Sequence, residues 1–224
     1  DSILEFGFEN VCIATGAKWR ADGVARQHVV PMPIAAGAKI YTPDDLMDGT
    51  IPQGKVIVFD DDHYYMGGVL AELLAKKGAD VTLVTPSAYV SDWTNNTLEQ
   101  IAIHPRLVDA GVEIVLNRGI TEIHAGHVVS NCVYTDRTKQ FECDAVVMVA
   151  SRKEENAIFD GLKAREAEWA DAGIKSVKII GDANAPGPIA WATYAGHRYA
   201  RELDSDDIGD ALPFRREITE LALD

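Results

Sequence analysis

The sequence predicts an α/β protein built on parallel β-sheet, and three observations support this fold class. Continuous apolar runs at residues 55–59, 81–84 and 144–150 are typical of strands that are buried on both faces of a sheet. Residues 67–77 lie between the first two runs and carry apolar side chains at helical spacing. These segments together form a βαβ unit, which implies that its two strands are parallel.

The N-terminal part begins with a strand over residues 9–14, which ends in a tight turn at Gly16. Residues 21–51 are rich in glycine, proline and small side chains. Within them, Thr42 can cap a helix whose first turn holds Pro43. We expect the chain to cross between domains near Gly37.

The elements after the βαβ unit follow the same alternation. We expect a helix over residues 96–110 that is broken near Pro105, and a strand over 112–116. Further strands are expected over 119–124, 127–133, 139–143 and 144–150. A charged helix over 157–173, a strand over 177–180 that ends at Gly181-Asp182, and a helix over 187–203 complete the chain.

Composition excludes several classes of function. The 21 basic and 35 acidic residues give a formal charge of −14, which disfavours nucleic-acid binding. No apolar run reaches the roughly 20 residues that span a bilayer, so we expect no membrane segment.

The three cysteines, Cys12, Cys132 and Cys143, are isolated in apolar segments and are interpreted as reduced thiols of a cytoplasmic protein. Without a Cys-x-x-Cys pair, they predict neither an iron–sulfur cluster nor a structural zinc site.

The βαβ unit lacks the glycines of a dinucleotide-binding fingerprint. The three glycine positions fall on Asp60, Asp62 and Tyr65, whose side chains would fill the space of the phosphates and repel their charge. Thr85-Pro86 stands where an acidic residue would hold a ribose or an arginine a 2′-phosphate. The sequence therefore predicts that this unit does not bind NAD(P).

The run from Asp60 to His63 could be taken for a metal site, but neighbouring residues on a turn point in different directions, so we interpret it as a solvated acidic turn. No nucleophile stands at recognisable spacing from the histidines, so no catalytic residue is predicted. Gly16 and the pair Gly181-Asp182 each follow an apolar strand on either side of the βαβ unit, which makes them the candidate nucleotide-binding residues.

Three stretches carry a family resemblance. Residues 14–19 (ATGAKW), 162–186 (LKAREAEWADAGIKSVKIIGDANAP) and 192–202 (ATYAGHRYARE) resemble the C-terminal part of the trimethylamine, dimethylamine and histamine dehydrogenases. The resemblance implies two Rossmann-like, glutathione-reductase-like nucleotide-binding domains. The first would be discontinuous and incomplete, comprising residues 1–37 and 151–224, and residues 38–150 would be the inserted second domain.

The resemblance also implies cofactors and partners. In the family an old-yellow-enzyme-like barrel holds FMN and a 4Fe–4S cluster, so neither would be bound by this chain. The first domain binds ADP, to which Gly16, Gly181 and Asp182 would correspond, and its main phosphate loop would precede residue 1. Expected partners are the barrel domain of the parent, an electron-transferring flavoprotein and, in a homodimer, a second parent chain.

Two alternatives remain open. The parent could be a reductase similar to 2,4-dienoyl-CoA reductase that takes hydride from NADPH, although the substitutions at Asp60, Asp62 and Tyr65 disfavour this. The chain could also be a non-catalytic module for ADP binding or docking.

The N-terminus has no basic leader and begins within a unit, so we expect a fragment without a signal peptide.

Overall fold

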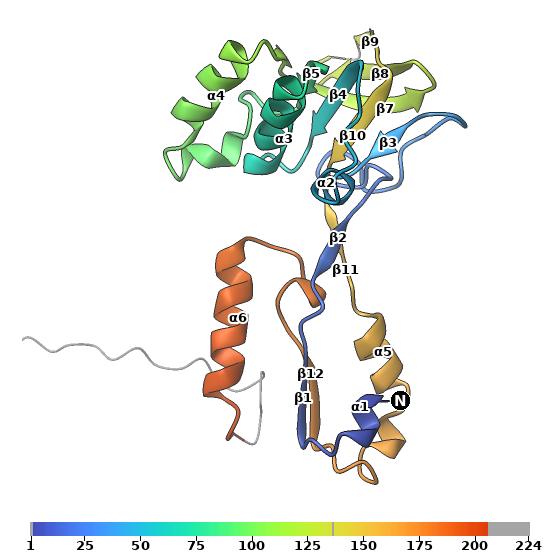
Figure 1. Cartoon of the computed structure of the whole chain (residues 1–224), viewed down its shortest axis with the longest axis vertical. Coiled ribbons are helices and arrows are strands. Elements are labelled where there is room, and N and C mark those ends of the chain that lie inside the picture. The colour runs from blue at the N-terminus through green and yellow to red at the C-terminus, as the bar shows by residue number, and fades with distance from the viewer. Residues whose placement is uncertain (1, 136, 206–224) are drawn as a thin grey trace, which may run out of the picture. The chain divides into compact units, whose positions relative to one another are not determined.

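A computed structural model describes residues 2–135 and 137–205 (Figure 1). The chain divides into two compact units, and we call residues 1–18 with 153–224 the split unit and residues 19–152 the inserted unit. Each contains helices and parallel strands, which confirms the α/β class. No helix in the described part of the chain is both long and apolar enough to cross a bilayer.

The inserted unit is built on a five-stranded parallel sheet with the order β3-β10-β4-β5-β6. Its strands are β3 (Ile40–Tyr41), β4 (Lys55–Asp60), β5 (Asp80–Val84), β6 (Glu113–Val115) and β10 (Ala145–Val149). Every residue of β10 is buried, as is every residue of β4 after Lys55. Burial on both faces explains why these strands are continuous apolar runs.

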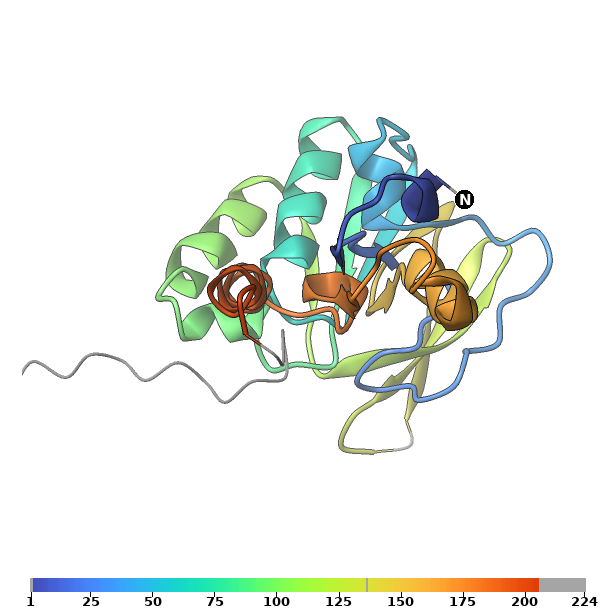
Figure 2. The ribbon, with the colours of Figure 1, turned by 90° about the horizontal axis from the view of Figure 1, so that it is seen from below.

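Two hydrophobic cores occupy the two faces of this sheet. Val56 and Val58 of β4 pack in the core that includes buried residues of α3 (Tyr65–Lys76) and α4 (Gln100–Asp109). Ile57 and Phe59 pack in the other core. This alternation follows from the two-residue period of a strand. Figures 1 and 2 show α3 and α4 side by side along one face.

A three-stranded antiparallel sheet covers the second face. It consists of β7 (Arg118–His124), β8 (His127–Cys132) and β9 (Thr138–Glu142) in sequence order. Ile120, Ile123, Val128 and Phe141 contribute the apolar side chains of this sheet to the second core. The three strands predicted here therefore form one meander.

Two shorter helical elements complete the inserted unit. Helix α2 (Pro43–Met47) begins where the sequence predicts, because Thr42 and Asp45 form a reciprocal capping box. The 3₁₀ helix η1 (Asp92–Asn95) follows β5 and leads towards α4. Thr94 in η1 is fully buried, which ties this connection to the body of the unit.

The split unit contains a two-stranded parallel sheet of β1 (Asn10–Ile13) and β12 (Ser176–Ile179). Its helical elements are α1 (Ser2–Glu5), α5 (Ala157–Lys163), η2 (Glu166–Glu168), η3 (Gly181–Ala183) and α6 (Ile189–Arg201). A small core is formed by Ile13, Leu162, Trp169, Ile174 and Val177. The short strands β2 (Ala17–Trp19) and β11 (Arg152–Glu154) pair with each other.

Two helix predictions were wrong in extent. Helix α4 is not broken at Pro105 but continues through it from Gln100 to Asp109. The carbonyl that lacks a backbone donor because of this proline is that of Ile101, which is an exposed residue, where water can supply the missing donor. The charged helix expected over 157–173 ends at Lys163, and only the short η2 follows.

The units divide at residues 18/19 and 152/153, whereas the sequence placed the crossings near 37/38 and 150/151. Residues 19–37 belong to the inserted unit because their side chains and backbone bind its strands. His28 Nε2 lies 2.7 Å from the Ile120 carbonyl oxygen, and Met32 is buried in the second core. The glycine and proline residues in this segment and its lack of a regular apolar period concealed these contacts.

Candidate functional site

The candidate nucleotide-binding residues come together at one edge of the split unit. Strands β1 and β12 are parallel, with Ile13 opposite Ile179, and the Ile180 amide donates to the Ile13 carbonyl oxygen at 2.9 Å. Gly16 and Gly181 each follow shortly after these strands. They therefore lie at the carboxyl edge of the same sheet, where ligands of open α/β sheets bind.

Both glycines have backbone conformations that disfavour other residues. Gly16 has a φ of +82° and Gly181 has a φ of +60°. A Cβ atom on Gly16 would have no neighbour within 4 Å, so the backbone there is open to an approaching group. A Cβ atom on Gly181 would lie 3.7 Å from the Cβ of Ala192 in α6. These two turns can bring peptide groups close to a ligand.

Asp182 organises the connection into α6. Its Oδ1 accepts a hydrogen bond from the Gly187 amide at 3.1 Å, which holds the loop that precedes Ile189. The Gly16 carbonyl oxygen likewise accepts from the Glu155 amide at 2.9 Å. Local hydrogen bonds therefore fix both loops of the candidate site.

The corresponding edge of the inserted unit is occupied by acidic side chains. Asp60, the last residue of β4, is fully buried, and Asp61 is 1% exposed. The prediction of a solvated acidic turn was wrong, because backbone amides hold these carboxylates inside the unit. His63 N donates to Asp60 Oδ1 at 2.9 Å, and Gln27 N donates to Asp61 Oδ2 at 2.9 Å.

The Asp60 carboxyl group fills the space beside the first turns of α3. A Cβ atom placed on Gly67 would lie 2.5 Å from Asp60 Cγ and 2.6 Å from its Oδ2. In a dinucleotide-binding unit, phosphates occupy the space between a strand end and the helix N-terminus that follows. The residues present therefore do not fit a pyrophosphate, in agreement with the fingerprint analysis.

Burial and nearby charges shift two of these carboxyl groups. Burial raises the pKa of Asp60 to about 7, and the His63 amide and imidazole oppose this shift. Burial also raises the pKa of Asp62, against the opposing effect of Arg152 and Arg26. The surroundings of Asp60 are thus less favourable for a negative charge than those of Asp62.

The end of β5 offers no group that recognises a ribose. Thr85 is fully buried, and its backbone amide donates to the Val115 carbonyl oxygen at 3.0 Å. Its hydroxyl accepts from the Ser87 amide at 3.2 Å. Both polar groups are therefore used within the fold.

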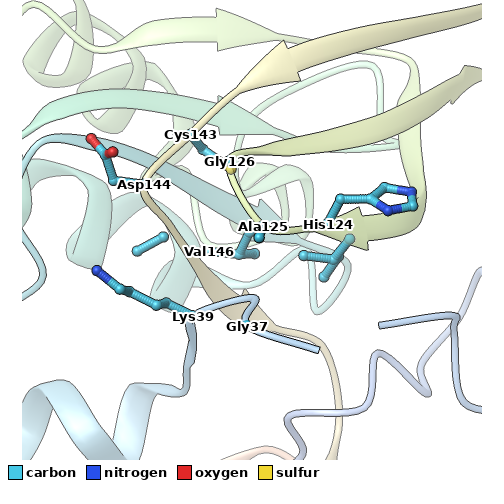
Figure 3. A pocket seen from close by; sticks show the side chains of 10 residues that line it. Gly37, Lys39, His124, Ala125, Gly126, Cys143, Asp144 and Val146 are labelled. Carbon is cyan, nitrogen blue, oxygen red and sulfur yellow. The ribbon is translucent and has the colours of Figure 1, made fainter. Parts of the chain in front are cut away.

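A cavity of about 230 Å³ lies at the opposite, amino end of β10 (Figure 3). Lys39, Asp144 and the β7–β8 turn at Gly126 line it, with Cys143 at its wall. Burial raises the pKa of the Cys143 thiol to about 11, so that this sulfur is protonated at neutral pH. The cavity therefore contains no activated nucleophile of its own.

The described residues do not bring together a metal-binding cluster. No group of three or more histidine, cysteine, aspartate or glutamate side chains among them could hold a metal ion. The three cysteines are free thiols, with Cys12 in β1, Cys132 at the end of β8 and Cys143 between β9 and β10. His124 and His127 stack on each other with ring centroids 4.7 Å apart, and His63 Nε2 lies 3.4 Å from Asp61 Oδ1.

Sequence reasoning missed the residues that surround the acidic loop. Gln27 contacts it from more than 30 positions away, and Arg26 lies over the Trp93 ring, 5.5 Å from its centroid. The Trp93 amide donates to the His63 carbonyl oxygen at 2.9 Å. No local pattern could have identified these partners, because separate loops supply them.

The fold of the inserted unit and the carboxyl edge of its sheet indicate the class of protein to which the chain belongs. Residues 41–159 match the model of the OYE-like second alpha/beta domain, and the chain belongs to this family. Its relatives identify it further with the trimethylamine, dimethylamine and histamine dehydrogenase family. The chain is 33% identical to dimethylamine dehydrogenase of Hyphomicrobium sp. (strain x), over 97% of this chain and 32% of that protein.

Two solved structures give the same placement. Histamine dehydrogenase from Rhizobium sp. 4-9 is 66% identical with a TM-score of 0.91, over 98% of this chain and 34% of the other. The 6-hydroxypseudooxynicotine amine oxidase from Pseudomonas geniculata N1 is 39% identical with a TM-score of 0.82, over 88% and 29%. The chain thus spans about a third of the length of these relatives.

Proposed function

We propose that this chain is the accessory nucleotide-domain region of a flavin- and iron–sulfur-dependent amine dehydrogenase. The names of the relatives support an amine as the substrate of the parent enzyme. In such an enzyme, electrons from the oxidised C–N bond pass through FMN and a 4Fe–4S cluster to an electron-transferring flavoprotein. This chain would not hold the cluster, because its three cysteines are free and do not come together in a metal-binding group among the described residues. The FMN would be held by the barrel domain of the parent.

The split unit and the inserted unit would be two Rossmann-like domains of the glutathione-reductase type. In the split unit, ADP would lie at the carboxyl edge of β1 and β12, against Gly16 and Gly181, with Asp182 ordering the loop before α6. The observation that carries this assignment is that both glycines follow neighbouring parallel strands and that the backbone at Gly16 is open. The main phosphate-binding loop would come from another part of the parent.

Calorimetry of the intact parent enzyme with ADP tests this site. We expect Gly16→Val to weaken ADP binding by at least about tenfold, because its side chain would project into the open space beside the backbone that the ligand approaches. Gly173→Val is the matched control, since Gly173 also has a positive φ, +75°, but lies before β12. Equal ADP affinity in both variants would exclude the proposed contact.

A reductase that takes hydride from NADPH is the second candidate. The Asp60 carboxyl beside Gly67 argues against it, because that space would have to receive the phosphates. Intact parent enzyme that oxidises NADPH without an amine would contradict our proposal. Amine-dependent reduction of an electron-transferring flavoprotein, with no NADPH oxidation, is the expected result.

The third candidate is a non-catalytic module that binds ADP or docks partners. It differs from the first in requiring that the chain bind ADP by itself. Titration of residues 1–224 with ADP distinguishes the two, because heat of binding at micromolar ligand would favour an independent module. We expect none, since the two loops at Gly16 and Gly181 supply only part of a phosphate site.

The parent would be a cytoplasmic homodimer in which this region contacts the barrel domain. Size-exclusion chromatography with light scattering on the intact parent tests the dimer. A monomeric parent at micromolar concentration would remove this part of the proposal.

A further inference from the structure

The Asp60 carboxyl group is buried without the partners that a carboxylate requires. It is fully inaccessible, and only Oδ1 accepts a hydrogen bond, from the His63 amide. Oδ2 is buried and has no hydrogen-bond partner. An ionised carboxylate in this position would leave its charge largely uncompensated, which is costly in a protein interior.

The charged groups around Asp60 do not neutralise it. Asp61 and Asp62 are its neighbours in the loop and add negative charge, whereas His63 is the positive group that acts on it. Gly67 packs against it from α3 and brings no charge. From β10, the Val149 carbonyl oxygen accepts hydrogen bonds from the amides of Asp61 and Asp62.

The remaining charged residues act on its neighbours. Arg26 and Arg152 lower the pKa of Asp62. Asp61 accepts from the Gln27 amide and lies 3.4 Å from His63 Nε2. Arg26 and Arg152 thus act on Asp62 and not on Asp60, and a proton is the simplest means by which Asp60 is neutralised.

The same loop holds backbone strain. His63 has a φ of +64°, in the left-handed region, and its carbonyl oxygen accepts from the Trp93 amide. Ser91 on the neighbouring loop has a φ of +49°, and its buried hydroxyl has no hydrogen-bond partner. The loops that contain His63 and Ser91 therefore each have a residue in a backbone conformation that L-residues disfavour. This strain reduces the free energy that holds the two loops in place.

We propose that residues 60–64 form a proton-operated latch, which is closed when Asp60 is protonated and opens when Asp60 releases its proton to water. The opening moves the carboxylate from beside Gly67 into solvent, where its charge is hydrated. It also separates the loop from Trp93 and from Gln27, so that the carboxyl edge of β4 and the start of α3 become accessible. This latch does not depend on the proposed amine dehydrogenase function.

Hydrogen–deuterium exchange of the full chain between pH 5 and pH 8 tests the latch. After correction for the intrinsic pH dependence of exchange, we expect the protection of residues 60–66 to fall by up to about tenfold per pH unit from pH 5 to pH 7. It should level off above pH 7, where Asp60 is ionised and the loop is already open. Asp60→Asn should show no such fall, because it carries no titrating group.

The matched control is Asp144→Asn, which removes an exposed carboxylate at the opposite end of the sheet and should behave as the unaltered chain. Equal pH dependence in the Asp60→Asn variant and the unaltered chain would overturn the latch. Infrared difference spectra of the unaltered chain provide a measurement that needs no variant. The carboxylic acid band of a buried group should disappear between pH 5 and pH 8, and its absence at pH 5 would also overturn the proposal.

Discussion

Replacing Asp60 by asparagine should stabilise the inserted unit at neutral and alkaline pH and change little in acid. The two side chains have the same shape, so the asparagine retains an oxygen that accepts from the His63 amide. Asparagine cannot ionise, however, whereas burial raises the pKa of Asp60 from 3.8 to about 7. The variant therefore isolates the free energy that is lost when this carboxyl group ionises within the fold.

The magnitude follows from the pKa difference. Because the folded-state pKa is raised, the contribution of Asp60 to stability is fully present below pH 3.8 and decreases as the pH rises towards 7. The loss reaches about 4 kcal/mol at pH 7 and above if the loop remains closed. If residues 60–64 open, the loss stops at the free energy of opening, since the carboxylate then ionises in water. A plateau well below about 4 kcal/mol thus indicates local opening.

Urea denaturation of both chains at pH 4, 5, 6, 7 and 8 measures this difference. The free energy of unfolding of the variant minus that of the unaltered chain should be close to zero at pH 4. It should rise through pH 5 and 6 and become constant above pH 7. A difference that does not change with pH would refute the reasoning, because it would mean that Asp60 ionises as readily in the fold as in the unfolded chain.

Two further outcomes test the packing of the inserted unit. Gly67→Ala should cost about 1–3 kcal/mol in urea denaturation, because the new methyl group would lie 2.5 Å from the Asp60 carboxyl carbon. Gly161→Ala, a helical position with no atom within 4 Å, should instead be neutral or stabilising by up to about 1 kcal/mol. Alkylation by iodoacetamide at pH 8, followed by peptide mass spectrometry, should modify Cys132 well before Cys143. Hydrogen bonds from Thr135 and the Tyr134 backbone lower the pKa of Cys132, whereas burial raises that of Cys143 to about 11; equal rates would contradict these assignments.

The sequence was sufficient to predict most of the strands and helices of the inserted unit, but not β3. Residues 55–59 and 144–150 are apolar at every position except the first of each run, because both faces of the sheet are covered. The start of α2 could also be predicted, because Thr42 and Asp45 cap it within four residues. A helix start that is set by residues adjacent in the sequence, or a strand in which every residue is buried, can therefore be predicted from a single sequence.

The acidic loop could not be predicted because its burial depends on distant segments. Three consecutive aspartates are usually hydrated, and nothing in residues 60–63 shows that the Gln27 amide or the Trp93 loop covers them. Pro105 was misleading for a related reason. Its effect depends on whether the carbonyl four residues earlier reaches water, and that exposure is a property of the fold.

The two sheet edges differ in the electrostatic potential that they offer to a nucleotide. At the edge of β1 and β12, the backbone at Gly16 is open, and the Gly187 amide holds the Asp182 carboxylate in the loop before α6. At the edge of β4, the Asp60 carboxyl group fills the space beside Gly67 in which a phosphate would lie. An anionic ligand there would require a cation to neutralise it, whereas a proton neutralises Asp60. In our proposals, the same buried carboxyl group would exclude the phosphates of a pyridine nucleotide and bind the proton that makes the inserted unit respond to pH.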